Sequence, residues 1–126
     1  MKKLIYTLLI IIALTNNSFS AGDSNTTAKA SDYTKAKNLI NAAKKYEKKG
    51  KIDKAQERYA KAQKLLLKSN EIKPLQADTL NYLGFTTRKL GDYEKGEKFY
   101  LLGLQVEPNH NGINEYLGEL YVATNR

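Results

Sequence analysis

Large, small and turn-forming residues recur in a fixed order along residues 77–110, and this order constrains the fold more than any other feature of the chain. The residues are Leu83, Gly84, Gly91, Tyr93, Gly96, Tyr100, Gly103 and Pro108. Apolar residues at helical spacing, interrupted by a glycine–aspartate turn and followed by a proline, predict two helices joined by a tight turn. The glycines inside these helices would allow their backbones to approach closely.

The same order returns on both sides of this passage. A spacing of 41 residues relates Ala42, Ala43, Gly50, Ile52, Ala55, Tyr59 and Ala62 to Leu83, Gly84, Gly91, Tyr93, Gly96, Tyr100 and Gly103. A spacing of 34 residues relates Pro74, Leu83, Gly84 and Thr87 to Pro108, Leu117, Gly118 and Tyr121. The difference of 7 residues is about two helical turns. We therefore expect residues 63–72 to lengthen a helix and not to form a loop.

The apolar spacing predicts five helices and an all-α fold. The expected helices run from Tyr33 to Gly50, from Ile52 to before Pro74, from about Ala77 to Leu90, from an Asp92 cap to about Val106, and through Ile113 and Leu120 to near Asn125. Ser31 and Asp32 are suitable N-caps for the first helix. No segment alternates between apolar and polar residues over a useful length, so we expect no sheet.

This arrangement resembles the tetratricopeptide repeat (TPR), a helix–turn–helix unit of 34 residues. The resemblance covers residues 36–125 and is strongest over 77–110. It implies a TPR-like repeat domain at 33–126, with about two and a half units of antiparallel helices stacked as an α-solenoid. Gly84 and Gly118 stand where the family keeps a small residue at a helix crossing, and Gly96 and Gly103 replace its usual alanines. Tyrosines 46, 59, 93, 100 and 121 are expected to fill gaps between helices.

The last predicted helix is more apolar than expected of a helix that caps the end of a repeat array. Leu117, Leu120 and Tyr121 favour a helix whose outer side is covered by further chain or by another copy. A self-assembling structural module, and thus a homo-oligomer formed through the C-terminal helix, is therefore one alternative function.

The N-terminus has the pattern of a secretory signal peptide. Lys2 and Lys3 precede an apolar segment of about 11 residues, shorter than the roughly 20 that span a bilayer. Ser18 and Ser20 are small residues at the −3 and −1 positions of a cut after residue 20. We therefore expect a signal peptide at 1–20, a flexible polar leader at 21–32, and export to the bacterial periplasm or beyond. An uncleaved membrane anchor is the alternative.

The composition argues against catalysis and against cofactor or metal binding. The chain has no cysteine and one histidine, which rules out disulfides and thiolate metal sites. His110 falls in a predicted turn, where we expect it to be solvated. Asp92 and Glu94 are too few for a calcium loop. The glycines lie at predicted helix ends and crossings and not in a phosphate-binding loop. We expect a protein that is not an enzyme.

The resemblance implies a peptide-binding groove on the concave face, formed by the first helix of each unit. The matching residues are Lys37, Ile40, Lys44, Glu47, Lys48, Asp78, Asn81, Phe85, Arg88, Lys89, Glu115, Glu119 and Val122. Phe85 is either an apolar anchor for a partner or a packing residue between helices. The Lys/Asn/Arg clamp by which some family members hold a carboxylate is missing, because Ile40, Tyr82 and Gly112 occupy its positions.

Charge is distributed unevenly along the chain. Residues 21–76 carry 14 lysines and arginines against 6 acidic residues, and residues 77–126 carry 5 against 7. The expected groove thus changes from basic at Lys44 and Lys48 to acidic at Glu115 and Glu119, which favours a bipolar peptide. We expect an exported scaffold that binds a protein or peptide. Electrostatic binding of an anionic polymer or lipid is a second alternative, and the packing positions of the tyrosines argue against nucleic acid.

Overall fold

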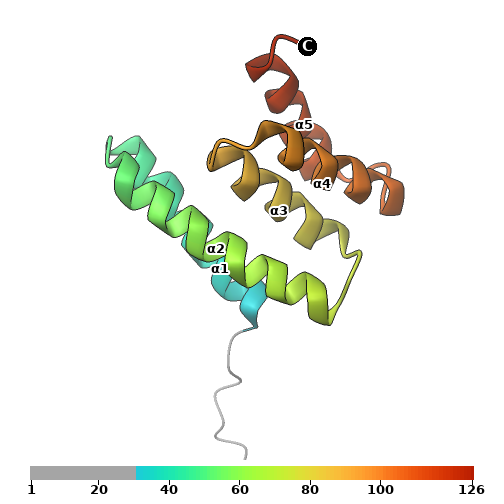
Figure 1. Cartoon of the computed structure of the whole chain (residues 1–126), viewed down its shortest axis with the longest axis horizontal. Helices are drawn as coiled ribbons and strands as arrows, with labels where there is room; N and C mark the ends of the chain where they lie inside the picture. Colours follow the sequence, from blue (N-terminus) through green and yellow to red (C-terminus); the bar gives the residue numbers. More distant parts are fainter. Residues whose placement is uncertain (1–30) are drawn as a thin grey trace, which may run out of the picture.

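The chain is all-helical over residues 31–126, the part that the computed structural model describes (Figure 1). The helices are α1 (Asp32–Lys48), α2 (Ile52–Ile72), α3 (Ala77–Lys89), α4 (Tyr93–Val106) and α5 (Asn111–Ala123). No strand occurs in this range, so the predicted all-α class is confirmed. The predicted signal peptide, and the predicted leader as far as residue 30, lie outside the described residues.

The first helix begins after the earlier of the two predicted capping residues. Ser31 is its N-cap, and the Ser31 hydroxyl accepts a hydrogen bond of 3.1 Å from the backbone N–H of Thr34. Asp32 is therefore the first helical residue, and its assignment to the leader was wrong. An acidic residue is stabilising in a first helical turn because the N-terminus of a helix carries partial positive charge.

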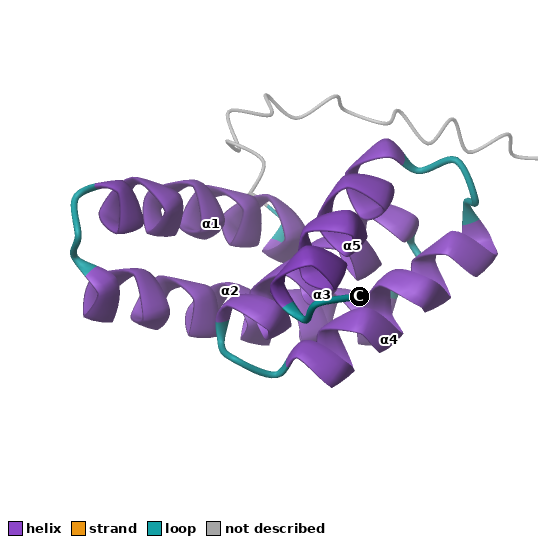
Figure 2. Cartoon of the chain, turned by 90° about the horizontal axis from the view of Figure 1, so that it is seen from above, coloured by secondary structure: helices purple, strands orange, loops and turns teal. Residues whose placement is uncertain are grey.

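Two glycines allow the chain to reverse between consecutive helices. Gly50 follows α1 with a φ of +68°, and Gly91 follows α3 with a φ of +100°. Other residues adopt this left-handed conformation at a cost, whereas glycine adopts it freely. The two glycines correspond at the 41-residue spacing, and each joins two helices of opposite direction (Figure 2).

The second helix is longer than the others, as the difference between the two spacings predicted. It runs without a break for 21 residues. Its extension buries Leu66 completely, while Leu67 and Ile72 remain exposed. Two extra turns thus keep one apolar stripe directed at the core.

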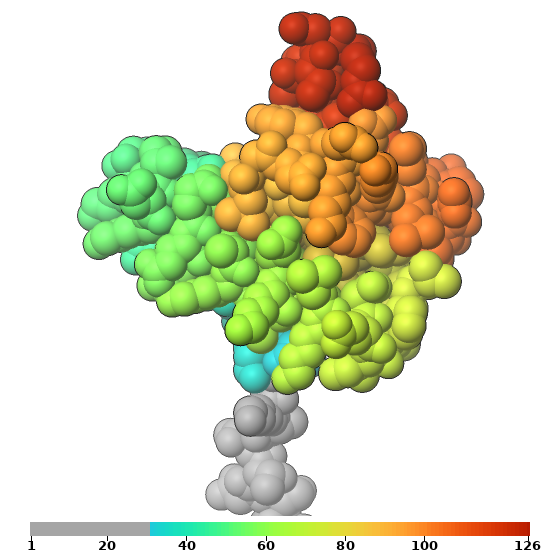
Figure 3. Space-filling view, viewed as in Figure 1, coloured from blue at the N-terminus to red at the C-terminus, as the bar shows by residue number. Residues whose placement is uncertain are grey.

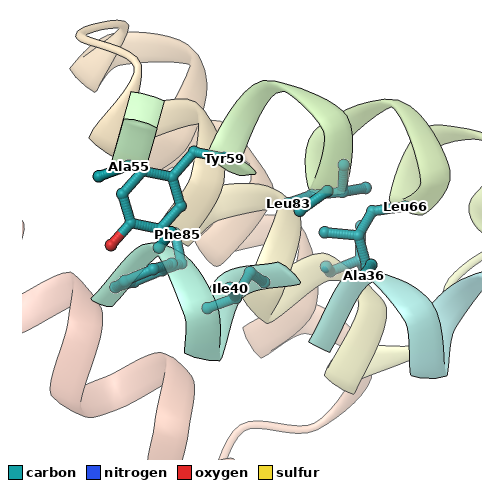
Figure 4. Close-up of a cluster of buried hydrophobic side chains, with 10 residues drawn as sticks. Ala36, Ile40, Ala55, Tyr59, Leu66, Leu83 and Phe85 are labelled. Atoms are coloured by element: carbon teal, nitrogen blue, oxygen red, sulfur yellow. The ribbon is translucent and has the colours of Figure 1, made fainter. Parts of the chain in front are cut away.

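Helices that are consecutive in the sequence pack against each other, and α3 also contacts α1 and α5. One core cluster forms mainly between α1, α2 and α3, and Figure 4 shows part of it. The residues in it are Ala36, Ile40, Ala43, Ala55, Tyr59, Ala62, Leu66, Leu80, Leu83 and Phe85. A second cluster combines Ala77, Tyr100, Ile113, Leu117 and Leu120 from α3, α4 and α5. The helix α3 contributes to both and is the centre of the domain.

The crossing of α3 and α4 depends on glycines, as predicted. A Cβ atom added to Gly84 would lie 2.9 Å from Cζ of Tyr100, inside the van der Waals distance. One added to Gly96 would lie 3.0 Å from the carbonyl oxygen of Gly84. An alanine at Gly96 would therefore place its methyl group tightly against the backbone of α3. The completely buried ring of Tyr100 fills the space that Gly84 leaves.

Two packing predictions were wrong. Gly118 is exposed, and an added Cβ would meet nothing within 4 Å, so no described helix crosses α5 there. Tyr93, the first residue of α4, is 42% exposed and fills no gap between helices. Tyr59 and Tyr100 are fully buried as expected, whereas Tyr46 and Tyr121 are half-buried.

The apolar residues of α5 face the rest of the domain. Ile113 and Leu120 are completely buried and Leu117 is 6% exposed, whereas Val122 is 79% exposed. The interpretation of these leucines as an outward apolar surface was therefore wrong. The C-terminal end of α5 projects from the domain in the space-filling view (Figure 3). None of the helices between residues 31 and 126 has the length and apolar character needed to cross a membrane.

Candidate functional site

Eight of the thirteen residues predicted for the groove line one open pocket of about 390 Å³ between α1, α3 and α5. We call it the α1–α3–α5 groove. Its lining residues are Lys44, Glu47, Lys48, Phe85, Arg88, Lys89, Glu115, Tyr116 and Glu119. The volume is within the range of roughly 300–1,000 Å³ that is usual for ligand sites.

Helical spacing explains why these side chains share one surface. Residues three or four positions apart are neighbours on one side of a helix. The pairs Lys44 with Lys48, Phe85 with Lys89, and Glu115 with Glu119 all have this spacing. The groove uses the C-terminal halves of α1 and α3, and α5 closes it from the other side.

Five predicted groove residues lie elsewhere: Ile40 is buried in the core, Val122 is 79% exposed, Asp78 contacts His110, and the other two are Lys37 and Asn81. Lys37 is about two turns from Lys44 along α1, and its ammonium lies 5.7 Å from the ring centre of Tyr33. Asn81 is 6% exposed and is covered by α5, since a Cβ added to Gly112 would lie 2.7 Å from the Asn81 amide nitrogen. Both residues belong to the N-terminal halves of their helices, which the groove does not reach, so both predictions were wrong.

Aromatic rings form the floor of the groove. Phe85 is 3% exposed, and its ring centre lies 5.7 Å from that of Tyr59 and 4.7 Å from that of Tyr116. Figure 4 shows Phe85 beside Tyr59 in the core cluster. Of the two interpretations of Phe85, packing between helices is therefore the one that the structure supports. Sequence reasoning missed Tyr116, although the 34-residue spacing relates it to another tyrosine, Tyr82.

Three cationic groups lie within 6 Å of the ring centre of Phe85. The distances are 4.7 Å for the Lys44 ammonium, 5.6 Å for the Arg88 guanidinium carbon and 5.9 Å for the Lys89 ammonium. Lys44 also donates a hydrogen bond of 2.9 Å to the hydroxyl of Tyr116. Cations are attracted to the faces of aromatic rings, which helps to hold these like charges together.

Carboxylates neutralise two of these three cations. Arg88 forms an ion pair of 2.7 Å with Glu119, and Lys89 forms one of 2.8 Å with Glu47. Glu47 also accepts a hydrogen bond of 2.9 Å from the Tyr59 hydroxyl. Burial and this hydrogen bond raise the pKa of Tyr59, which keeps it a neutral donor. No carboxylate of residues 31–126 lies within 4 Å of the Lys44 ammonium.

Arg88 is a largely buried charge of the groove. Its side chain is 10% exposed, and its Nε atom is buried without a hydrogen-bond partner in the described part of the chain. The hydroxyl of Tyr100 is likewise buried without a hydrogen-bond partner in this part of the chain. Burial raises the pKa of Tyr100, and the positive charge of Arg88 opposes that rise. Between residues 31 and 126, the only ion-pair partner of this buried cation is Glu119, whose carboxylate is half exposed. The charge of Arg88 therefore favours further negative charge nearby.

The histidine has a structural position that the sequence did not reveal. His110 is the N-cap of α5, where its Nδ1 accepts a hydrogen bond of 3.1 Å from the backbone N–H of Ile113. In the neutral ring the other nitrogen, Nε2, is therefore protonated and donates to Asp78 across 2.8 Å. The side chain is only 11% exposed, so the expectation of a solvated histidine was wrong. Asp78 lies with His110, outside the groove.

The groove can hold charged and amphipathic groups. Its rim offers ammonium and carboxylate groups, and its floor offers aromatic rings. Within residues 31–126, no three His, Asp or Glu side chains gather as a metal ion would require. No protein-family model matches the chain, and no curated protein matches it.

Proposed function

We propose that the chain is an exported scaffold of the tetratricopeptide type that binds an extended segment of another protein in the α1–α3–α5 groove and has no catalytic activity. One observation carries this proposal. Side chains from three helices far apart in the sequence line one open groove, and most were predicted from the repeat pattern. Polar groups that converge from several elements, and can fix the orientation of a partner, are typical of a recognition site.

The charges on the rim give the groove a direction. Lys44 and Lys48 lie on the α1 side, and Glu115 and Glu119 lie on the α5 side. Complementary charges fix the register and orientation of a partner more than they raise its affinity. A segment that carries an acidic residue near α1 and a basic residue near α5 fits this arrangement.

The pairing of the helices supports the repeat interpretation. The pairs α1–α2 and α3–α4 each reverse at a glycine with positive φ, and these glycines correspond at the 41-residue spacing. The helices α1, α3 and α5 are then the first helices of successive units. In a stacked repeat array, such equivalent helices form a shared surface.

A selection experiment tests the proposed function. A phage-displayed library of random dodecapeptides is selected on the purified full chain, and the affinities of enriched peptides are measured by fluorescence polarisation. We expect Lys48→Glu, on the groove rim, to weaken binding about tenfold or more, as the reversal of a contacting charge does. Lys49→Glu makes the same change of charge outside the groove and should have little effect. Failure to enrich any peptide, or equal effects of the two variants, would contradict the proposal.

Export is tested separately. Mass spectrometry of the protein recovered from a bacterial host should find Ala21 as the first residue. Recovery of the intact N-terminus with the membrane fraction would instead support an uncleaved anchor.

A further inference from the structure

The groove carries one positive charge in excess. Four cationic side chains, Lys44, Lys48, Arg88 and Lys89, line it together with three acidic ones, Glu47, Glu115 and Glu119. Two of the four cations are paired within the groove, Arg88 with Glu119 and Lys89 with Glu47. The unmatched charge therefore lies on the α1 side, at Lys44 and Lys48.

Lys44 is held in place without a negative partner. Its ammonium lies 4.7 Å from the ring centre of Phe85 and 5.3 Å from that of Tyr116, and it donates one hydrogen bond, to the Tyr116 hydroxyl. An ammonium has three N–H donors, so two remain for other acceptors. The hydrogen bond and the rings fix the position of the cation before any ligand arrives, which lowers the entropy cost of binding.

The other two cations beside the Phe85 ring already have carboxylate partners, so Lys44 is the cation beside this ring that lacks one among the described residues. The guanidinium of Arg88 and the ammonium of Lys89 lie near the same Phe85 ring. Arg88 is 10% exposed, which reduces the screening of its charge by water. A single negative charge placed beside Lys44 would match the excess. A dianionic group would exceed it and would also be repelled by the three carboxylates of the groove.

We propose that Lys44 is a specificity-determining residue that receives one carboxylate, from an aspartate or glutamate of the bound segment, over the Phe85 and Tyr116 rings. This inference rests on the proposed peptide-binding function. Lys48, one turn further along α1, provides a second contact at the rim. The half-buried ring of Tyr116 gives an adjoining apolar surface for a neighbour of that acidic residue.

Parallel selections test the inference. The dodecapeptide library is selected on the wild-type chain, on Lys44→Met and on Lys45→Met, and the frequency of Asp and Glu in enriched peptides is compared with that of the starting library. Methionine keeps most of the aliphatic length of lysine and removes its charge. Lys45 is an exposed lysine of the same helix outside the groove, so Lys45→Met controls for net charge. Acidic enrichment should persist on Lys45→Met and be lost on Lys44→Met.

The preferred peptide then gives a quantitative test. Replacing its enriched acidic residue by the corresponding amide should weaken binding about five- to tenfold on the wild-type chain, a loss typical of a partly buried charge pair. The same replacement should have almost no effect on Lys44→Met and its full effect on Lys44→Arg, which restores the charge.

The possible failures are distinguishable. Enriched peptides that compete for the groove without an acidic preference would overturn the role of Lys44 and leave groove binding intact. An acidic preference that is equally strong on Lys44→Met and on Lys45→Met would also overturn the role of Lys44 and leave groove binding intact. Absence of any enriched peptide would overturn both proposals.

Discussion

At the residue scale, two glycines related by the 34-residue spacing have opposite environments. Gly84 faces the ring of Tyr100, whereas Gly118 faces open space. Gly84→Ala should therefore overpack the crossing of α3 and α4 and cost about 1–3 kcal/mol more than Gly118→Ala. Both variants share the gain in helix propensity of about 1 kcal/mol, so the difference between them isolates the clash. Urea unfolding of both variants measures this difference.

Whether each substitution raises or lowers the free energy of unfolding distinguishes the two environments. Gly118→Ala should leave the free energy of unfolding unchanged or raise it by up to about 1 kcal/mol. Equal stabilisation by both substitutions would show that the two helices do not approach each other closely at Gly84.

Phe85 should contribute more to stability than the groove position alone suggests. Its ring is 3% exposed and packs between Tyr59 and Tyr116, so Phe85→Ala should lower the free energy of unfolding by about 3–5 kcal/mol. This is a large part of the roughly 5–15 kcal/mol that is typical of a domain. Chemical denaturation measures the loss. A loss in the free energy of unfolding below about 1 kcal/mol would indicate that Phe85 is an exposed anchor and not a core residue.

At the element scale, the start of α5 depends on His110. His110→Ala removes the hydrogen bond to the Ile113 amide and the one to Asp78, and should cost about 1 kcal/mol or slightly more. Hydrogen exchange of the α5 amides should become faster while that of α2 is unchanged. His110→Asn keeps a capping side chain and should recover part of the protection. Unchanged exchange in His110→Ala would mean that α5 is held by packing alone.

The other end of α5 is linked to α4 by a pH-sensitive ion pair. Arg126 contacts Glu97 with both terminal nitrogens, at 3.1 and 2.6 Å. The hydrogen bond from Arg126 lowers the pKa of the Glu97 carboxyl from its ordinary value of 4.5. A group whose folded pKa is lowered stabilises the fold above the unfolded pKa and loses this contribution as the pH falls through the folded pKa.

The effect of Arg126→Gln should therefore depend on pH. The melting temperature of this variant should be slightly lower than that of the wild type at neutral pH, because exposed ion pairs contribute little. The two melting temperatures should converge as the pH falls below about 4.5, the ordinary value for Glu97. Thermal melts between pH 7 and about pH 3 test this prediction. A difference between the two melting temperatures that grew as the pH fell would contradict the predicted direction of the effect.

At the scale of the whole molecule, sequence periodicity predicted the elements and most of the groove. The apolar spacing and the two turn glycines gave five helices with ends within one or two residues of those observed. Because α1, α3 and α5 repeat one register, matching them predicted which side chains converge at Lys44, Arg88 and Glu119. These properties are local or periodic, and a sequence encodes both directly.

The failed predictions concern neighbours that periodicity does not specify. Gly118 matches Gly84 in sequence, but the described residues contain no helix that covers it. His110 lies in a turn, and its burial results from contacts with α3 and α5. Lys37 and Asn81 have the register of groove residues but lie too far towards the N-terminal ends of their helices. A repeat pattern identifies the face of a helix and leaves open what covers each part of it.

The most direct test of the central claim is to locate a bound peptide. A peptide selected on the wild-type chain is labelled with a nitroxide, and the paramagnetic broadening of backbone amide signals is measured by NMR. We predict broadening at residues 44–48 of α1, 85–89 of α3 and 115–119 of α5, with the outer faces of α2 and α4 unaffected. Broadening concentrated on α2 or α4, or spread evenly over the domain, would contradict recognition in the α1–α3–α5 groove.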